Sequence, residues 1–304
     1  MFSTTRRTAL FALPLAAAML TMVGCGSDTD NAAEASDSNT LFFSAIPDDN
    51  KTELAQRYQL LADYLSEKLE VEVAYNPSSN YTASVEAFKA GDIQLAWFGG
   101  GSGVQARTAV EGANAIAQGK VDPQYKSYFI ANVDSGLMPS EDFPMGMEGK
   151  TFTFGSSGST SGRIMPEYFL KEATGKGPEE FFGHPNKFSG SHDLTAEQVQ
   201  DGTVQCGAMN YKTYDRLVAS GKIDPAKCIK IWTTPDYPDY NWTAHPDLEK
   251  RFGAGFTEKL QKVLVGITDP EILLALDRPE GIIAATNADF QPVADTMKIL
   301  GLLR

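Results

Sequence analysis

Residues 41–98 alternate between short apolar runs and amphipathic stretches, and this alternation limits the possible folds more than any other feature of the chain. The apolar runs Leu41–Ile46, Val71–Tyr75 and Ile93–Phe98 have the length and composition of buried strands. Between them, residues 52–70 carry leucines and a tyrosine at helical spacing, and residues 81–90 predict a second helix. Strand, helix, strand, helix, strand is typical of an open α/β sheet with right-handed crossovers. A glycine-rich turn, residues 99–103, is expected to follow.

The same alternation begins again after residue 127. Further strands are predicted at 128–133, 151–154, 205–209 and 229–232, and further helices at 164–173, 196–201, 256–265, 270–276 and 292–303. Residues 235–242, which are acidic and aromatic, are expected to form a turn. We therefore predict two α/β lobes, each a mixed sheet flanked by helices, with 41–131 in the first and 132–232 in the second. Residues 233–304 would return to the first lobe, and a ligand would bind in the cleft between the lobes.

The first 25 residues have the features of an export signal. Arg6 and Arg7 precede an apolar stretch, residues 9–23, that is too short to span a bilayer comfortably. The tetrad Met22-Val23-Gly24-Cys25 resembles a bacterial lipobox, in which the cysteine becomes lipidated. The alternative is an ordinary secretory signal with an incidental cysteine. Residues 26–40 contain no large apolar side chain and predict a flexible tether, so we expect a lipid-anchored protein in the periplasm or at the cell surface.

The charge of the chain excludes several classes of partner. The full sequence has 26 basic and 39 acidic residues, a net charge of −13. Without residues 1–24, which hold two arginines and no acidic residue, 24 basic and 39 acidic residues remain, a net charge of −15. Nucleic acids and anionic membrane surfaces require clustered positive charge, so neither is an expected partner. The sequence has no further hydrophobic stretch of about 20 residues, so the body of the protein is not expected to be a channel or permease.

Residues 150–162, KTFTFGSSGSTSG, give the strongest local indication of a binding site. A strand leads into glycines and hydroxyl residues, and then into a helix that is expected to begin near Arg163. Free N–H groups at a helix start, flanked by the hydroxyls of Ser159, Thr160 and Ser161, can receive a tetrahedral anion. The alternative is that these residues only cap the helix and tighten the turn. The segment is not a P-loop, because its glycine spacing is wrong and no Lys-Ser/Thr pair follows.

Catalytic and metal-binding patterns are weak. His184, His192 and His245 lack the spacing of a zinc site, and no G-x-S-x-G elbow is present. No cofactor or metal is therefore expected. Cys206 and Cys228 could form a disulfide or remain separate thiols, and the sequence leaves both possibilities open.

Several motifs, taken in order, resemble one known family. They are FSAIP at 43–47, GD at 91–92, AWFG at 96–99, GKTF at 149–152, STSG at 159–162 and FSGSHD at 188–193. This combination, over roughly residues 41–250, is similar to the phosphonate-type periplasmic binding proteins of ABC importers, which take phosphonates, phosphite or phosphate. The stretch DYNWT at 239–243 looks closest to a branch of this family labelled selenate-binding.

The resemblance implies the fold, the function and the site. The fold would be a two-lobed, type II-like periplasmic binding protein, and Ser159, Thr160 and Ser161 would hold the anion. Tyr81 and Tyr125 match positions that add hydroxyl donors, and His192 matches a histidine at the cleft edge. Tyr240 belongs to an aromatic stretch beside the predicted crossover, and such a cluster suits a wall of the cleft. Family members that bind aminophosphonates place acidic side chains around the amine. The corresponding stretches here offer Lys212 and Tyr240 instead, which disfavours an aminated ligand.

The predicted function is therefore capture of a small tetrahedral oxyanion, without chemistry, and its delivery to an ABC permease and its ATPase. A monomer suits this mode of action. The alternatives are a binding protein for another small anion, a ligand-sensing subunit, or a secreted hydrolase that uses His192 as a base.

Overall fold

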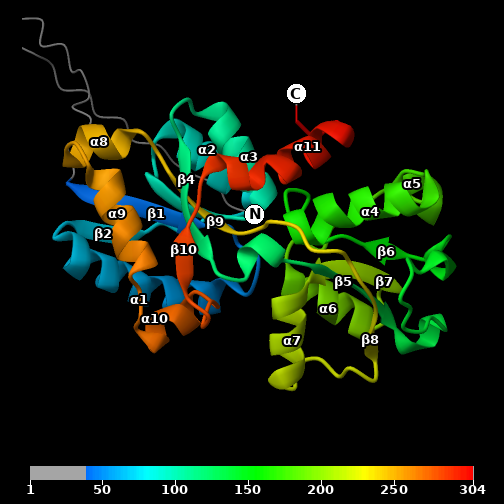
Figure 1. The fold of residues 1–304 in the computed structure, drawn as a ribbon. Helices are drawn as coiled ribbons and strands as arrows, with labels where there is room; N and C mark the ends of the chain where they lie inside the picture. The colour runs from blue at the N-terminus through cyan, green and yellow to red at the C-terminus, as the bar shows by residue number, and fades with distance from the viewer. Residues whose placement is uncertain (1–38, 304) are drawn as a thin grey trace, which may run out of the picture. The chain divides into compact units, whose positions relative to one another are not determined.

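The computed structural model describes residues 39–303, which fold around two β-sheets (Figure 1). The predicted signal peptide, Cys25 and nearly all of the predicted tether lie outside the described residues. The first sheet has the strand order β10-β4-β9-β3-β1-β2, and the second has the order β6-β7-β5-β8. The strands are β1 (Thr40–Ala45), β2 (Glu72–Tyr75), β3 (Leu95–Phe98), β4 (Asn114–Gly119), β5 (Ser127–Asn132), β6 (Phe152–Thr153), β7 (Cys206–Asn210), β8 (Cys228–Thr233), β9 (Asn241–Ala244) and β10 (Ile282–Ala284).

The start of the first lobe follows the predicted alternation. β1 pairs in parallel with both β2 and β3, as two βαβ units require. Helix α1 (Lys51–Leu69) buries its leucines and Tyr58 against the sheet, and the Asn50 side chain accepts hydrogen bonds from two N–H groups of its first turn. Helix α2 (Tyr81–Ala90) begins after a second asparagine cap, Asn80, and ends at Gly91. The predicted helices and strands are therefore confirmed here to within two residues.

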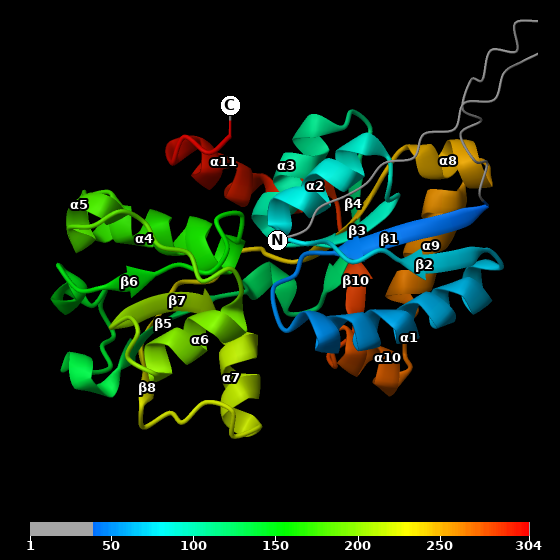
Figure 2. The same ribbon diagram turned by 180° about the vertical axis from the view of Figure 1, so that it is seen from behind.

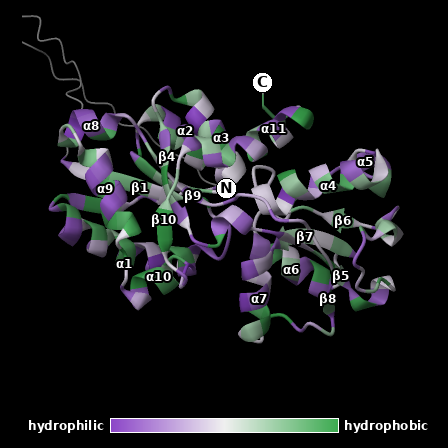
Figure 3. Ribbon diagram, in the orientation of Figure 1, coloured by the Kyte–Doolittle hydropathy of each residue, from purple (hydrophilic) through white to green (hydrophobic). Residues whose placement is uncertain are grey.

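The remaining helices cover both faces of the two sheets. They are α3 (Gly100–Ala109), α4 (Met165–Thr174), α5 (Pro178–Phe182), α6 (His192–Gln200), α7 (Tyr211–Ala219), α8 (Asp247–Phe252), α9 (Phe256–Val265), α10 (Pro270–Ala275) and α11 (Gln291–Ile299). In both views of the ribbon, α1 and α10 lie on one side of the first sheet and α2 and α3 on the other (Figures 1 and 2). Hydrophilic and hydrophobic turns alternate along these helices, as expected for amphipathic helices that pack on a sheet (Figure 3). No helix within residues 39–303 has the length and apolarity needed to cross a membrane.

Two sequence predictions in the first lobe are wrong. Gly99–Gly103 was expected to be a turn, but Gly100 begins α3. Residues 235–242 were expected to form a turn, but the last two of them belong to the buried strand β9, Asn241–Ala244, which pairs with β3 and β4. Its alternating polar residues hide it from a search for apolar runs. Asn241 and Thr243 remain buried because Arg107 donates a hydrogen bond of 2.8 Å to each.

The chain crosses between the lobes twice, and the two crossing segments lie side by side. The first crossing lies between β4 and β5, and the second between β8 and β9. Tyr125 and Tyr237 exchange backbone hydrogen bonds of 2.9 Å, and the N–H of Asp239 donates to the carbonyl of Asp122 at 3.0 Å. The predicted lobe boundary at residues 131 and 132 is too late, because β5 is an inner strand of the second sheet. The first crossing therefore precedes Ser127.

Cys206 and Cys228 are buried free thiols. They lie on β7 and β8, on opposite sides of β5, where their register partners are Ala131 and Asn132. Two strand spacings, about 10 Å, exceed the reach of a disulfide. Of the two possibilities that the sequence left open, a disulfide or separate thiols, the structure shows separate thiols.

Candidate functional site

Four helix starts meet around the loop that contains residues 155–162. Tyr81, Gly100 and His192 are the first residues of α2, α3 and α6, and Thr160 begins a wide helical turn, Thr160–Ile164, that continues as α4. Gly101 N–H donates to the Thr160 hydroxyl at 2.9 Å, which joins α3 to this turn. A Cβ at Gly158 would lie 3.3 Å from Tyr81, and a Cβ at Gly162 would lie 3.0 Å from His192. The positive ends of four helices therefore lie close to one loop, which suits an anion.

The hydroxyls of Ser159 and Thr160 are oriented as donors. Ser159 caps the turn by accepting the N–H of Gly162 at 2.9 Å, and Thr160 accepts the N–H of Gly101. Each hydroxyl oxygen therefore accepts a backbone N–H and has its own proton to donate. In the structure the Ser159 side chain also hydrogen-bonds with Tyr81, and the Thr160 side chain with the Asp239 carboxyl group. Ser161 is equally buried, and its carbonyl accepts a hydrogen bond of 2.7 Å from Ser127. The three residues singled out by the sequence lie together at the helix start.

His192 adds a neutral donor to the same place. Its Nδ1 accepts the backbone N–H of Asn210 at 3.2 Å, so the ring proton belongs on Nε2. Burial lowers the pKa of His192 to about 3, so the ring is uncharged near neutral pH. Nε2 is buried and has no hydrogen-bond partner among the described residues. A buried donor without a partner is costly, so His192 Nε2 is a candidate to donate to a ligand.

Asp239 is a residue of the site that the sequence did not reveal. Its Oδ1 accepts the N–H of Gly100 at 2.8 Å, whereas its buried Oδ2 has no hydrogen-bond partner among residues 39–303. A Cβ at Gly99 would lie 3.1 Å from the Thr160 hydroxyl and 3.2 Å from Asp239, so both side chains face the same glycine. Burial raises the pKa of Asp239 to about 7. The helix starts thus have a carboxyl group, that of Asp239, among several donors.

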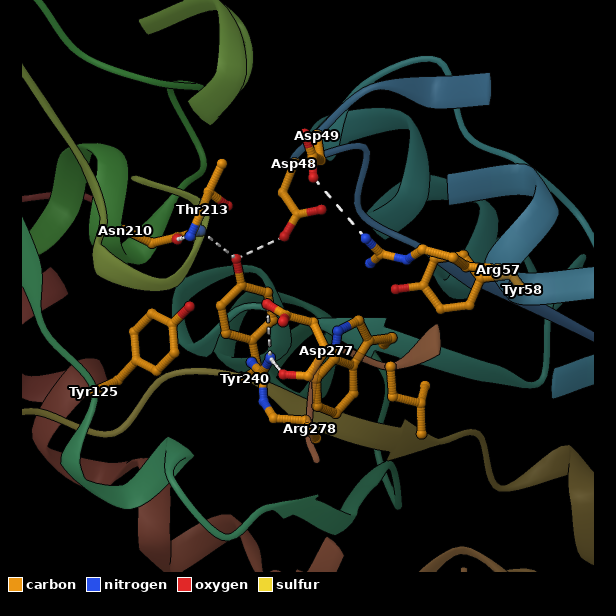
Figure 4. Close-up of a pocket in the computed structure, with 12 residues that line it drawn as sticks. Asp48, Asp49, Arg57, Tyr58, Tyr125, Asn210, Thr213, Tyr240, Asp277 and Arg278 are labelled. Atoms are coloured by element: carbon orange, nitrogen blue, oxygen red, sulfur yellow. Dashed lines mark hydrogen bonds and ion pairs between the residues drawn. The ribbon is translucent and has the colours of Figure 1, made fainter. Parts of the chain in front are cut away.

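Tyr125 and Tyr240 form an aromatic wall beside this cluster, together with Trp97. The rings of Trp97 and Tyr240 are stacked with centroids 5.5 Å apart, and Tyr125 lies 5.2 Å from Tyr240. The wall lines a cavity of about 20 Å³ (Figure 4), which is room for about one water molecule. The Tyr240 hydroxyl donates to Asp48 at 2.6 Å and accepts from Asn210 at 3.2 Å. Its proton is therefore already used, and the ring rather than the hydroxyl is available to a ligand.

The lobes are joined across the cleft by further polar contacts. Asp49 of the first lobe forms an ion pair with Arg216 of the second, and Glu53 pairs with Lys222 at 2.7 Å. Lys212, which the family resemblance implied to be near the ligand, forms an ion pair with Glu280 at 3.5 Å. The ion pairs of Asp49 and Glu53 join the two lobes. Asp48 is half-buried here, and desolvation raises its pKa to about 6.

The two lobes, the cleft and its buried donors can be compared with known proteins. Residues 43–290 match the family described as ABC transporter, phosphonate, periplasmic substrate-binding protein. The chain belongs to this family. The predicted function as a periplasmic substrate-binding component of an ABC transporter is thereby confirmed, and such components are not enzymes.

Individual relatives of this phosphonate-family chain agree with the match. The probable ABC transporter phosphite binding protein PhnD1 of Prochlorococcus marinus is 41% identical over 225 residues, which is 73% of this chain and 75% of the relative. The phosphate-import protein PhnD of Mycolicibacterium smegmatis is 25% identical over 93% of both chains. The structure of PhnD1 from Prochlorococcus marinus in complex with methylphosphonate has a TM-score of 0.82 and 37% identity. The structural match covers 88% of this chain and 100% of the PhnD1 chain, and it confirms the two-lobed α/β fold.

The close contact between α3 and β9 in this family member leads to a prediction about stability. A Cβ at Gly103 would lie 2.7 Å from Asn241 Oδ1 and 2.8 Å from Arg107 Nη1. Gly103→Ala should therefore lower the free energy of unfolding by about 1–3 kcal/mol, although alanine normally favours a helix. Urea unfolding measures the change. Gly177→Ala is the matched control, because φ there is −75° and a Cβ meets nothing within 4 Å. Equal stability of both variants would mean that α3 can move away from β9.

Proposed function

We propose that this protein captures a small, singly protonated tetrahedral oxyanion, such as phosphite or methylphosphonate, for an ABC importer. The observation that carries the proposal is the pair of unpartnered buried atoms, His192 Nε2 and Asp239 Oδ2. The first is a donor for an anionic oxygen, and the second, when ionised, is an acceptor for a protonated oxygen. The PhnD1 relative is described as a phosphite binding protein, and its structure is a complex with methylphosphonate. Both ligands belong to the proposed class.

The Asp239 carboxyl group provides a basis for selectivity. An ionised Asp239 repels an anion unless one ligand oxygen carries a proton to share with it. Phosphite, phosphate and phosphonates have such a form near neutral pH, whereas sulfate and selenate do not. An oxyanion without a proton would leave the Asp239 carboxylate unpaired in a buried site, which is costly. This reasoning disfavours selenate, the ligand suggested by the stretch at 239–243.

Ligand titration tests the proposal directly. Phosphite, methylphosphonate, phosphate, 2-aminoethylphosphonate, sulfate and selenate are compared by thermal shift and by isothermal titration calorimetry, with residues 1–25 removed. A ligand at a hundred times its Kd stabilises the folded state by about 2.7 kcal/mol, which a thermal scan resolves. We expect phosphite or methylphosphonate to give the largest shift and sulfate none. A stronger response to sulfate or selenate would refute the role given to Asp239.

The anchoring and the assembly of the protein are part of the proposal. We infer that Cys25 carries a lipid that holds the protein at the membrane, and that the protein acts as a monomer. Cys25→Ser should move the protein from the membrane fraction to the soluble fraction of exported protein. An unchanged distribution would favour an ordinary secretory signal over a lipobox.

A further inference from the structure

Arg278 is a buried cation that the proposed binding step has not yet used. It follows α10 and is 2% exposed, and its Nε and Nη2 donate to the Asp122 carboxylate at 2.8–3.0 Å. Nη1 donates to the carbonyl of Asp277 at 2.8 Å. All three guanidinium nitrogens are therefore held, so the planar group has a fixed position.

The guanidinium lies against all three rings of the aromatic wall. Its central carbon is 4.8 Å from the ring centre of Tyr240, 5.3 Å from that of Trp97 and 5.6 Å from that of Tyr125. A cation within about 6 Å of a ring face is attracted by the ring electrons. One side chain thus sets the position of three rings that come from β3 and from both crossing segments.

The partner of Arg278 connects the same group to the crossings between the lobes. Asp122 is fully buried in the first crossing, and its carboxylate also accepts the N–H of Gly119 at 2.7 Å. Its carbonyl accepts the N–H of Asp239, which belongs to the second crossing and to the ligand site. A Cβ at Gly119 would lie 2.4 Å from Arg278, so the chain leaves room for the guanidinium at this point.

We propose that Arg278 is a positioning residue for ligand capture, which holds the aromatic wall and the paired crossings in the arrangement of the closed cleft. Tyr240 then transmits this arrangement to both lobes, because its hydroxyl joins Asp48 to Asn210. Stability alone does not require such a pair, since a buried ion pair can often be replaced by apolar side chains without loss. The inference rests on the proposed function, because its effect is measured through ligand binding.

The test compares Arg278→Lys with Arg107→Lys. Arg278 is buried and Arg107 is half-buried, and both lie over aromatic rings. Arg107 faces Phe290, at 4.9 Å, and does not line the cavity. Lysine keeps the charge at position 278 but cannot hold Asp122 through two nitrogens and cover three rings. We expect the Kd for methylphosphonate to rise about 30-fold, or about 2 kcal/mol, in Arg278→Lys and less than about threefold in Arg107→Lys. Stopped-flow tryptophan fluorescence should assign most of the loss to faster dissociation.

Several outcomes would separate this inference from its alternatives. If Arg278→Lys lowers Tm but leaves Kd and the dissociation rate unchanged, the residue is only structural and the inference fails. If Arg278→Lys does not fold, the double variant Asp122→Asn/Arg278→Met, which leaves no unpaired charge, takes its place, with the same expected loss of affinity. If the unmodified protein binds neither methylphosphonate nor phosphite, the proposed function fails first, and the near-ultraviolet circular dichroism of Arg278→Lys still reports whether the wall has moved.

Discussion

Replacing Ser159 and Thr160 together by alanine is expected to abolish high-affinity binding of phosphite or methylphosphonate. Each hydroxyl accepts a backbone N–H and so has its own proton to donate at the helix start. A hydrogen bond to a charged group contributes about 1.5–3 kcal/mol, so losing two should raise Kd by about a hundred- to ten-thousand-fold. Isothermal titration calorimetry measures this change directly.

The control for this variant lies in the same loop. Ser157 is exposed, and its side chain forms no part of the helix start, so Ser157→Ala should bind as the unmodified protein does. Ser159→Ala also removes a helix cap, which costs about 0.5–2 kcal/mol of stability, and binding is therefore measured well below Tm. Retention of binding within about tenfold, in a folded double variant, would place the anion elsewhere in the cleft.

Asp239→Asn should make the protein more stable and its ligand binding weaker. Burial raises the pKa of Asp239 from 3.8 to about 7, so the folded state holds this proton more tightly than the unfolded state. The resulting stabilisation is complete below about pH 4 and is lost as the pH rises through about 7. Asparagine does not titrate, so the variant should exceed the unmodified protein in Tm at about pH 8, and the difference should disappear only below about pH 4.

The binding of the same variant should change in the opposite direction. The amide places a donor where Oδ2 accepted the proton of the ligand, and the mismatch should weaken phosphite binding about ten- to a hundredfold near pH 6. Sulfate, which brings no proton, should bind better to Asp239→Asn than to the unmodified protein. Calorimetric titrations of both ligands give the ratio of affinities, and an unchanged ratio would show that Asp239 does not select the protonated form.

The elements that were predicted well are those whose signals lie within a few residues. The helix at 81–90 has an asparagine cap, an apolar face and a glycine at its end, and its predicted bounds agree with α2. The strand β9 has four residues, two of them polar, and its burial depends on Arg107 from another helix. No local pattern contains that information, since tertiary contacts decide it.

The same distinction separates the predicted site residues from those that were missed. Ser159, Thr160 and Ser161 are consecutive and begin a helix, so their shared role can be inferred from order alone. Asp239 lies in the second crossing and Arg278 lies in the segment after α10, so only the folded chain brings them to the cleft. From charge alone, a carboxylate is not expected beside an anion. The role proposed for Asp239 rests on its burial, its raised pKa and its unpartnered Oδ2, which only the structure shows.

The position of β9 between β3 and β4 has a consequence for how the protein matures during export. A chain that emerges from a translocon with its N-terminus first exposes β1 to β4 long before residues 241–244 arrive. Until then β3 and β4 lack the strand that joins them, and their apolar faces and edges are open to aggregation. We expect the first lobe to complete its sheet only after the second lobe has been released. Chaperones that hold unfolded exported chains would therefore be needed longest for the N-terminal half.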